Sequence, residues 1–275
     1  MLPITLRTKF RSMSEEGILE QHKEYVESLV SAQIVQKGLL PKKRHFKRLF
    51  SKSFVFYQPK QIISGDFFWV GGRHNLRYLV VGDCTGHGIP AALISVLALS
   101  LLEYVIMNKG IKRTNNILKE VDKKFIESFK QNDDTLFDNP WIDISIVCID
   151  DDLNKLYYSS ANRRMLHVGA NKQVKLYKGS RYPIGGWQVK ANRYFESEVV
   201  GFEKGDCIFL GTDGFQDQMG GEFNKKYKSQ KLHEFLGRNS HLKLEVQQEL
   251  LETEFRNWKN SNPQTDDICI VGIQL

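Results

Sequence analysis

Four aspartates, each beside an apolar strand-like run and a glycine or turn residue, constrain this chain more than any other feature of its sequence. They are Asp66, Asp83, Asp213 and Asp266. Glycine beside an acid lets the backbone turn sharply and approach a ligand closely. One such aspartate alone is more typical of a turn whose side chain binds its own backbone. Four at strand ends favour a shared acidic site.

Carboxylates that converge in this way repel one another at low local dielectric, so they require cations. An all-oxygen site without a histidine or cysteine ligand favours Mg²⁺ or Mn²⁺ over Zn²⁺. Two such ions can hold a water between them, lower its pKa and neutralise the charge that develops on a phosphoryl group. The residues themselves therefore predict hydrolysis of a phosphate ester.

The positive charge of the chain does not indicate nucleic-acid binding. The formal net charge is +7 for 275 residues, and much of the excess lies in one run, residues 42–48. A nucleic-acid site needs basic residues interleaved with stacking aromatics, or a known reader motif, and the sequence has neither. We interpret the run as a solvated linker, with a docking patch for an acidic partner as the alternative.

The cysteines and apolar runs predict a cytoplasmic protein without a membrane segment. None of the four cysteines belongs to a C-x-x-C pair, so buried free thiols explain them better than disulfides or zinc. Basic residues near the N-terminus lead into an acidic amphipathic stretch, and no signal peptide is expected. The apolar run of residues 89–102 is short and contains a proline, which is typical of a buried helix.

Apolar periodicity divides the chain into a helical extension and a larger domain. Residues 14–40 carry apolar side chains three and four apart, which predicts a helix with one buried face. This helix either packs on the domain that follows or pairs with a second copy of itself. We place the extension and its basic linker at residues 1–48 and the main domain at residues 49–275.

Within the main domain, antiparallel strands with two helices inserted early and two late predict an α+β fold, with helices covering both faces of a β-sandwich. The expected strands are residues 54–57, 67–70, 77–81, 143–149, 155–160, 165–168, 194–199, 206–211 and 268–275. The expected helices begin near residues 90 and 114 and cover residues 231–236 and 244–258.

Residues 82–92 read GDCTGHGIPAA. They resemble the G-D-x-[ST]-G-H-G-x-[PA]-A-A signature of the SpoIIE-like branch of metal-dependent (PPM, type 2C) protein serine/threonine phosphatases. Together the similar segments span roughly residues 32–275. Other landmarks of that family follow in the same order at residues 32–41, 63–68, 211–214 and 265–268.

The resemblance implies a four-layer α/β/β/α sandwich with an N-terminal helical extension, and a site for two Mn²⁺ or Mg²⁺ ions. Asp83 would bridge the ions and, with Asp213, act in catalysis through a metal-bound water. Asp66 would contact the site directly or through water, and the backbone carbonyl of Cys84 and the carboxylate of Asp266 would complete the ligands. The implied substrate is phosphoserine or phosphothreonine on a protein, often a small regulator of the anti-sigma-antagonist type.

Neighbouring residues are expected to support these ligands. Asp267 and Gly214 are expected behind them, although the sequence alone hardly separates Asp266 from Asp267 as the direct ligand. Arg163 and Arg164 stand where relatives have an asparagine–proline turn. These arginines either meet a substrate phosphate or, in our preferred interpretation, lie on a surface turn.

Competing enzyme classes lack their motifs. No cysteine is followed six residues later by arginine, the calcineurin-like G-D-x-x-D-R-G and G-N-H-E are absent, and there is no P-loop or G-x-S-x-G elbow. The alternative function is a pseudophosphatase that keeps the fold and acts as a binding or sensor module. The expected partners are a phosphoprotein substrate and, through the N-terminal helix, an upstream sensor or a second copy of the chain.

Overall fold

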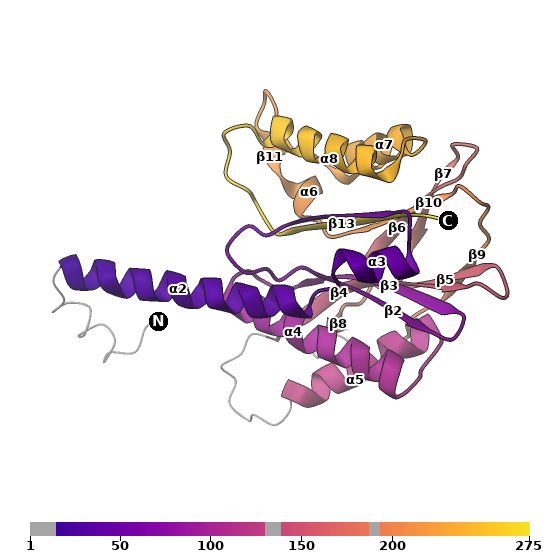
Figure 1. Cartoon of the computed structure of the whole chain (residues 1–275), viewed down its shortest axis with the longest axis horizontal. Coiled ribbons are helices and arrows are strands. Elements are labelled where there is room, and N and C mark those ends of the chain that lie inside the picture. The colour runs from indigo at the N-terminus through magenta and orange to yellow at the C-terminus, as the bar shows by residue number, and fades with distance from the viewer. Residues whose placement is uncertain (1–14, 130–138, 187–192) are drawn as a thin grey trace.

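Two antiparallel β-sheets form the centre of the molecule, with helices on both outer faces (Figure 1). The computed structural model describes residues 15–129, 139–186 and 193–275. The covering helices are α4 (Ile89–Glu103) and α5 (Thr114–Phe129) on one side and α7 (Ser229–Asn239) and α8 (Leu244–Lys259) on the other.

The first sheet has the strand order β2-β3-β4-β5-β9, and β8 pairs with β4. In its register Phe67 lies opposite Gly82, and Asp83 lies opposite Asp143. Two acids therefore stand side by side at one end of this sheet. Its strands are β2 (Phe67–Arg73), β3 (Leu76–Cys84), β4 (Trp141–Asp150), β5 (Lys155–Ala161), β8 (Ile184–Gly185) and β9 (Glu198–Val200).

The second sheet has the strand order β1-β13-β10-β6-β7. The chain crosses from the first sheet to the second between β5 and β6, through residues 162–163. The short helix α6 (Gly214–Asp217) and the paired strands β11 (Met219–Gly220) and β12 (Lys225–Lys226) follow β10. The strands of this sheet are β1 (Ser53–Gln58), β6 (Arg164–Val168), β7 (Val174–Lys178), β10 (Cys207–Gly211) and β13 (Ile268–Gln274).

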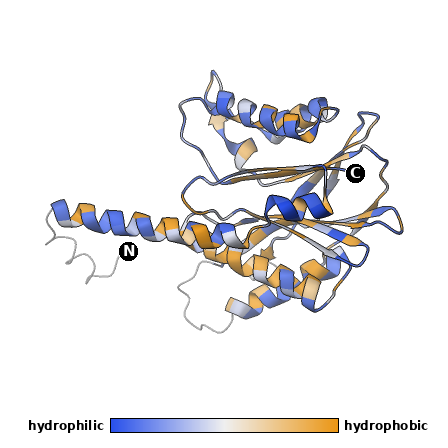
Figure 2. Ribbon diagram, in the orientation of Figure 1, coloured by the Kyte–Doolittle hydropathy of each residue, from blue (hydrophilic) through white to orange (hydrophobic). Residues whose placement is uncertain are grey.

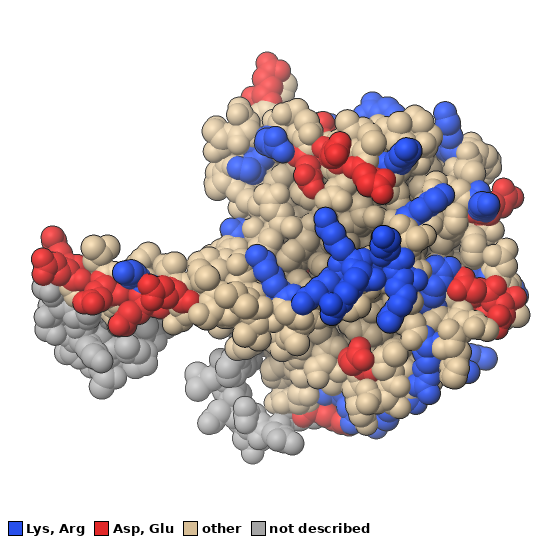
Figure 3. All heavy atoms as spheres, in the orientation of Figure 1, with Lys and Arg blue, Asp and Glu red and all other residues tan. Residues whose placement is uncertain are grey.

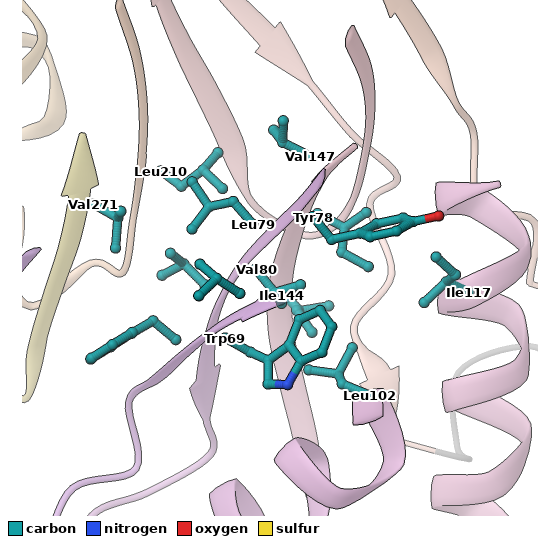
Figure 4. Close-up of a cluster of buried hydrophobic side chains, with 14 of the residues drawn as sticks. Trp69, Tyr78, Leu79, Val80, Leu102, Ile117, Ile144, Val147, Leu210 and Val271 are labelled. Carbon is teal, nitrogen blue, oxygen red and sulfur yellow. The ribbon is translucent and has the colours of Figure 1, made fainter. Parts of the chain in front are cut away.

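Alternating side chains along the strands build two layers of core. In β10, Ile208 and Leu210 pack in the cluster that includes the space between the sheets, whereas Phe209 packs with the residues of α7 and α8. Successive residues of a strand point to opposite faces, so one strand supplies both layers. Figure 4 shows Leu210 and Val271 of the second sheet facing Leu79 of the first.

Helix α4 closes the outer face of the first sheet, and the π-helical turn η1 (Tyr104–Asn108) extends it. Within the described residues, Ile89–Asn108 is the one helical stretch long and apolar enough to cross a membrane, and 44% of it is buried inside the structure. Its buried face includes Ala91, Ala98 and Leu102, which pack in the core.

Helix α2 (Glu15–Leu39) runs out from the body of the sandwich and reaches α4 only with its C-terminal part (Figure 1). Its surface is mixed, with apolar residues exposed among polar ones (Figure 2). Gln36 is buried at the contact: its amide nitrogen donates to the Ser64 carbonyl at 2.6 Å and to Ser95 Oγ at 3.0 Å. The N-terminal helix therefore contacts both the segment before Asp66 and helix α4.

The basic run forms a short helix, α3 (Lys43–Leu49), rather than an irregular linker. Phe46 anchors it, being buried in the core against Phe68 of β2, and Phe50 is buried directly after the helix. The lysines and arginines point to solvent and form one positive patch over α3 (Figure 3). Solvation of these charges agrees with the sequence interpretation, but the helix itself was not predicted.

The α+β architecture of two antiparallel sheets flanked by helices, with a long N-terminal helix, confirms the predicted fold. The four cysteines are buried and unpaired, as expected. The strand predicted at residues 194–199 is observed only as β9, because pairing with β5 begins at Glu198. The backbone amide of Glu196 donates to Ser180 Oγ at 3.0 Å instead of to a neighbouring strand. The division at residues 48 and 49 stays a prediction, and residues 1–14 lie outside the described part.

Candidate metal centre

The predicted aspartates lie at the same end of the two sheets. Asp66 directly precedes β2, and Asp83 is the penultimate residue of β3. Asp213 lies two residues after β10 and directly before α6, and Asp266 lies just before β13. Asp213 and Asp266 lie near enough to Asp83 to raise its pKa. Asp83 in turn lies near enough to Asp66 to raise the pKa of that residue. Hairpin register and sheet packing thus bring together residues that are up to 200 positions apart in sequence.

Asp66 is the most deeply placed of the four, with 2% of its surface exposed. Burial, together with repulsion from Asp83, raises the pKa of Asp66 well above its ordinary value. Its Oδ2 accepts a hydrogen bond of 2.6 Å from the hydroxyl of Thr212, which directly follows β10 of the other sheet. This hydrogen bond ties the two halves of the site together.

Asp83 stands at the centre of the acidic group, which comprises Asp66, Asp83, Asp143, Asp213 and Asp266. Burial raises its pKa to about 8, with repulsion from Asp213, Asp143 and Asp266 adding to the rise and the Arg163 guanidinium opposing it. Asp143 lies directly opposite on β4, and its own pKa is also raised by burial. Asp143 was not predicted from the sequence. The available signal was an acidic residue between two isoleucines of a strand, Ile142 and Ile144, which are both buried.

Arg163 lies inside the acidic group, which corrects the preferred sequence interpretation of a surface turn. Its side chain is only 10% exposed and pairs with Asp83, with Asp213 at 3.1 Å and with Asp143 at 3.5 Å. The Arg163 side chain points toward these acids because the chain turns sharply between the two sheets, where Asn162 adopts a positive φ of 59°. Arg164, the next residue, is exposed.

Asp266 and Asp267 are separated by their hydrogen bonds. Both carboxylate oxygens of Asp267 accept backbone N–H groups, from Lys60 at 2.7 Å and from Gly65 at 2.8 Å. Both oxygens of Asp267 are therefore occupied by the backbone of the segment before Asp66. Asp266 accepts only the amide of its neighbour at 2.8 Å, and burial followed by repulsion from Asp213 raises its pKa. We therefore assign Asp266 as the candidate ligand and Asp267 as its support.

Two glycines allow backbone segments to meet behind the carboxylates. A side chain at position 214 would place its Cβ 1.8 Å from the carbonyl oxygen of Asp267, so only glycine fits there. A side chain at position 65 would meet Ala91 at 2.9 Å and the carbonyl oxygen of Cys84 at 3.2 Å. Gly214 is thus a packing residue behind Asp266, and Gly65 lets its segment pack on the Cys84 carbonyl.

The residues present fit divalent cations in their chemistry. The donors are carboxylate oxygens, which Mg²⁺ and Mn²⁺ prefer. Burial, together with repulsion between neighbouring carboxylates, raises the pKa values of Asp66, Asp83, Asp143 and Asp266. Oδ1 of Asp143 is buried without a hydrogen-bond partner. Among the described residues, however, no three acidic, histidine or cysteine side chains are close enough to hold an ion as they stand. Arg163 occupies the space between two of the proposed ligands.

Residues 75–275 match the sequence family described as Stage II sporulation protein E (SpoIIE). The chain belongs to the SpoIIE family. Its fold is that of PP2C-type phosphatases, a family of serine/threonine phosphatases, and this membership agrees with the resemblance noted in the sequence. Comparison with curated proteins gives no match.

Solved structures share the fold of this SpoIIE-family chain. The SiaA-PP2C domain of Pseudomonas aeruginosa is 25% identical, with a TM-score of 0.83 over 93% of this chain and 98% of that one. The phosphatase domain of SpoIIE from Bacillus subtilis, with a fragment of its regulatory domain, is 17% identical, with a TM-score of 0.61 over 82% of this chain and 63% of that one. RsbX in complex with magnesium is 15% identical, with a TM-score of 0.57 over 81% and 94%.

Proposed function

We propose that this PP2C-type domain hydrolyses phosphoserine or phosphothreonine on a protein, with two Mn²⁺ or Mg²⁺ ions held by Asp66, Asp83, Asp213 and Asp266. The observation that carries the proposal is the placement of these aspartates, from both sheets, at one end of the sandwich and around Asp83. The family supports it, and the related RsbX was crystallised with magnesium. Bound there, the cations supply a water of lowered pKa and neutralise charge on the phosphoryl group.

The protein itself contributes orientation. Asp83 and Asp213 face the site from different sheets, so their separation is fixed by how the sheets pack. The Thr212 hydroxyl holds one oxygen of Asp66, which leaves its other oxygen for a cation or an ordered water. The backbone carbonyl of Cys84 is proposed as a further ligand. Pre-oriented donors of this kind need little rearrangement during the reaction.

A cavity of about 340 Å³ begins at the acidic group and continues between the second sheet and α7. Asp213 and Arg163 lie at one end of it, and Arg164, Gln216 and His233 line its wall. Its basic and hydrogen-bonding groups suit a phosphorylated segment of a protein. We propose that this cavity receives the residues next to the phosphate, and that the substrate is a small signalling regulator of the anti-sigma-antagonist type.

The test is phosphate release from a phosphoserine peptide by the purified chain, with p-nitrophenyl phosphate as a generic substrate. We expect release in the presence of Mn²⁺ and none in EDTA. A well-folded chain that releases no phosphate from either compound with Mn²⁺ or Mg²⁺ contradicts the proposal. It would favour the alternative, a pseudophosphatase that acts as a binding or sensor module, for which the placement of Arg163 between Asp83 and Asp213 is the structural argument.

We also propose that α2 pairs with α2 of a second copy and so couples an upstream signal to the site. Ile18 and Tyr25 are apolar residues seven positions apart, on the part of α2 that extends away from the sandwich. They are 46% and 53% exposed. Such spacing suits a helix pair, and Gln36 connects the same helix to Ser64 and Ser95. The cytoplasm, with neither nucleic acid nor membrane as a partner, is the proposed setting.

The pairing is tested by light scattering after size-exclusion chromatography. We expect a dimer for the wild type and a monomer for the double variant Ile18→Lys with Tyr25→Lys, because two buried lysines would separate the helices. Lys23→Gln, on the same exposed stretch, serves as the control and should remain dimeric. A wild type that is monomeric at every concentration contradicts the proposal.

A further inference from the structure

Arg163 is held in place by more than its ion pairs. It lies on the turn that carries the chain from β5 of the first sheet to β6 of the second. Two hydroxyls donate to its carbonyl oxygen, Ser160 Oγ at 2.6 Å and Tyr158 Oη at 3.0 Å. The backbone of this residue is therefore fixed at the boundary of the two sheets, with its side chain directed into the acidic group.

The guanidinium joins the two candidate ligands that come from different sheets. One terminal nitrogen pairs with Asp83 of the first sheet, and the other lies 3.1 Å from Asp213 of the second. Only 10% of the arginine side chain is exposed. The Arg163 guanidinium would therefore compete with a metal ion for the oxygens of Asp83 and Asp213.

The hydrogen bonds of the guanidinium are nevertheless incomplete. Its Nε is buried without a hydrogen-bond partner, and the same is true of Oδ1 of Asp143, although Oδ2 of that residue lies 3.5 Å from the arginine. Arg163 therefore has an additional acceptor beside it that is not among the proposed ligands.

We propose that Arg163 is a built-in counter-cation, which pairs with Asp83 and Asp213 when no metal is bound and which divalent ions must displace from them. The inference rests on the proposed metal-dependent function. An arginine stays charged at all working pH values and cannot ligate a metal, so it repels an arriving cation. Arg163 thus lowers the affinity of the site for metal and stabilises the metal-free fold.

The experiment measures Mn²⁺ affinity by isothermal titration calorimetry on the full chain and on Arg163→Gln, Arg163→Lys and Arg164→Gln. Removing the charge in Arg163→Gln is expected to tighten Mn²⁺ binding roughly tenfold, a typical coupling between two interacting sites. Arg163→Lys keeps the charge and should bind Mn²⁺ nearly as the wild type does. Arg164→Gln changes an exposed neighbour and should leave the affinity unchanged.

Thermal unfolding supplies a second readout. In EDTA, Arg163→Gln should melt at a lower temperature than the wild type, because its carboxylates lose their counter-charge. With saturating Mn²⁺ the difference should disappear or reverse. An arginine that is merely structural would lower the melting temperature in both conditions and would not tighten metal binding.

The outcomes distinguish this inference from the proposed function. If the wild type binds Mn²⁺ and hydrolyses p-nitrophenyl phosphate, but Arg163→Gln binds Mn²⁺ equally or more weakly, only the role of Arg163 is overturned. If no variant binds Mn²⁺, both fall. Should Arg163→Gln fail to fold, the side-chain NMR signal of Arg163 in the wild type decides: a shift on addition of Mg²⁺ supports displacement, and an unchanged signal overturns it.

Discussion

Asp213→Asn is expected to lower the Mn²⁺-dependent turnover of the chain by roughly 10³-fold, as is typical when a group that stabilises the transition state is lost. The side chain of Asp213 is 37% exposed, and its ion pair with Arg163 is the contact that changes. The free energy of unfolding should therefore change by less than about 1 kcal/mol. The measurements are kcat for p-nitrophenyl phosphate at saturating Mn²⁺ and the urea midpoint.

The matched control for Asp213 is Asp217, four residues along the chain. Asp217 pairs with Lys226 on the surface at 2.9 Å and lies outside the acidic group. Its side chain is 40% exposed, which is similar to that of Asp213. Asp217→Asn should retain wild-type turnover. Near-wild-type activity of Asp213→Asn would remove Asp213 from the metal centre, whereas an equal loss in both variants would point to a non-specific effect of charge.

Asp267→Ala is expected to destabilise the fold by roughly 2–5 kcal/mol, because two backbone N–H groups lose their acceptor in a buried place. These are the amides of Lys60 and Gly65, which Asp267 holds at 2.7 and 2.8 Å, while Asp267 itself is 4% exposed. Urea unfolding in EDTA measures the loss without any contribution from bound metal.

Asp266→Ala is the companion variant, and its profile should be the opposite. It should change the stability of the metal-free chain little and weaken Mn²⁺ binding, because Asp266 accepts only one local hydrogen bond and is the candidate ligand. The reverse pattern, with stability lost in Asp266→Ala and metal affinity lost in Asp267→Ala, would exchange the two assignments.

Much of the fold was predictable from local pattern. Strands such as β10 and β13 alternate between two packed faces, and helices such as α5 place Ile117, Val121 and Phe125 on one buried side. Helix α3 was not predicted, because its sequence is dominated by charge and only Phe46 and the following Phe50 mark a buried side. Residues this few give no periodicity to detect.

The candidate site was predictable where glycine and aspartate occur together at strand ends, as at Asp83 and Asp213. Asp143 reaches the site through its pairing with Asp83, a relation between strands that are 60 positions apart. The direction of Arg163 depends on the positive φ of Asn162 and on how the two sheets meet. Such relations are non-local, so the four aspartates were predicted as candidate ligands, whereas Asp143 was missed and Arg163 was assigned to a surface turn in the preferred interpretation.

Carboxylates from both sheets are proposed to form a site for two divalent cations. Titration of the metal-free chain with Mn²⁺ by isothermal calorimetry tests it most directly. We expect two ions bound per chain in the wild type and the loss of at least one in Asp83→Asn, because Asp83 is the proposed bridge. No binding in the wild type, or the same two ions in Asp83→Asn, would contradict it.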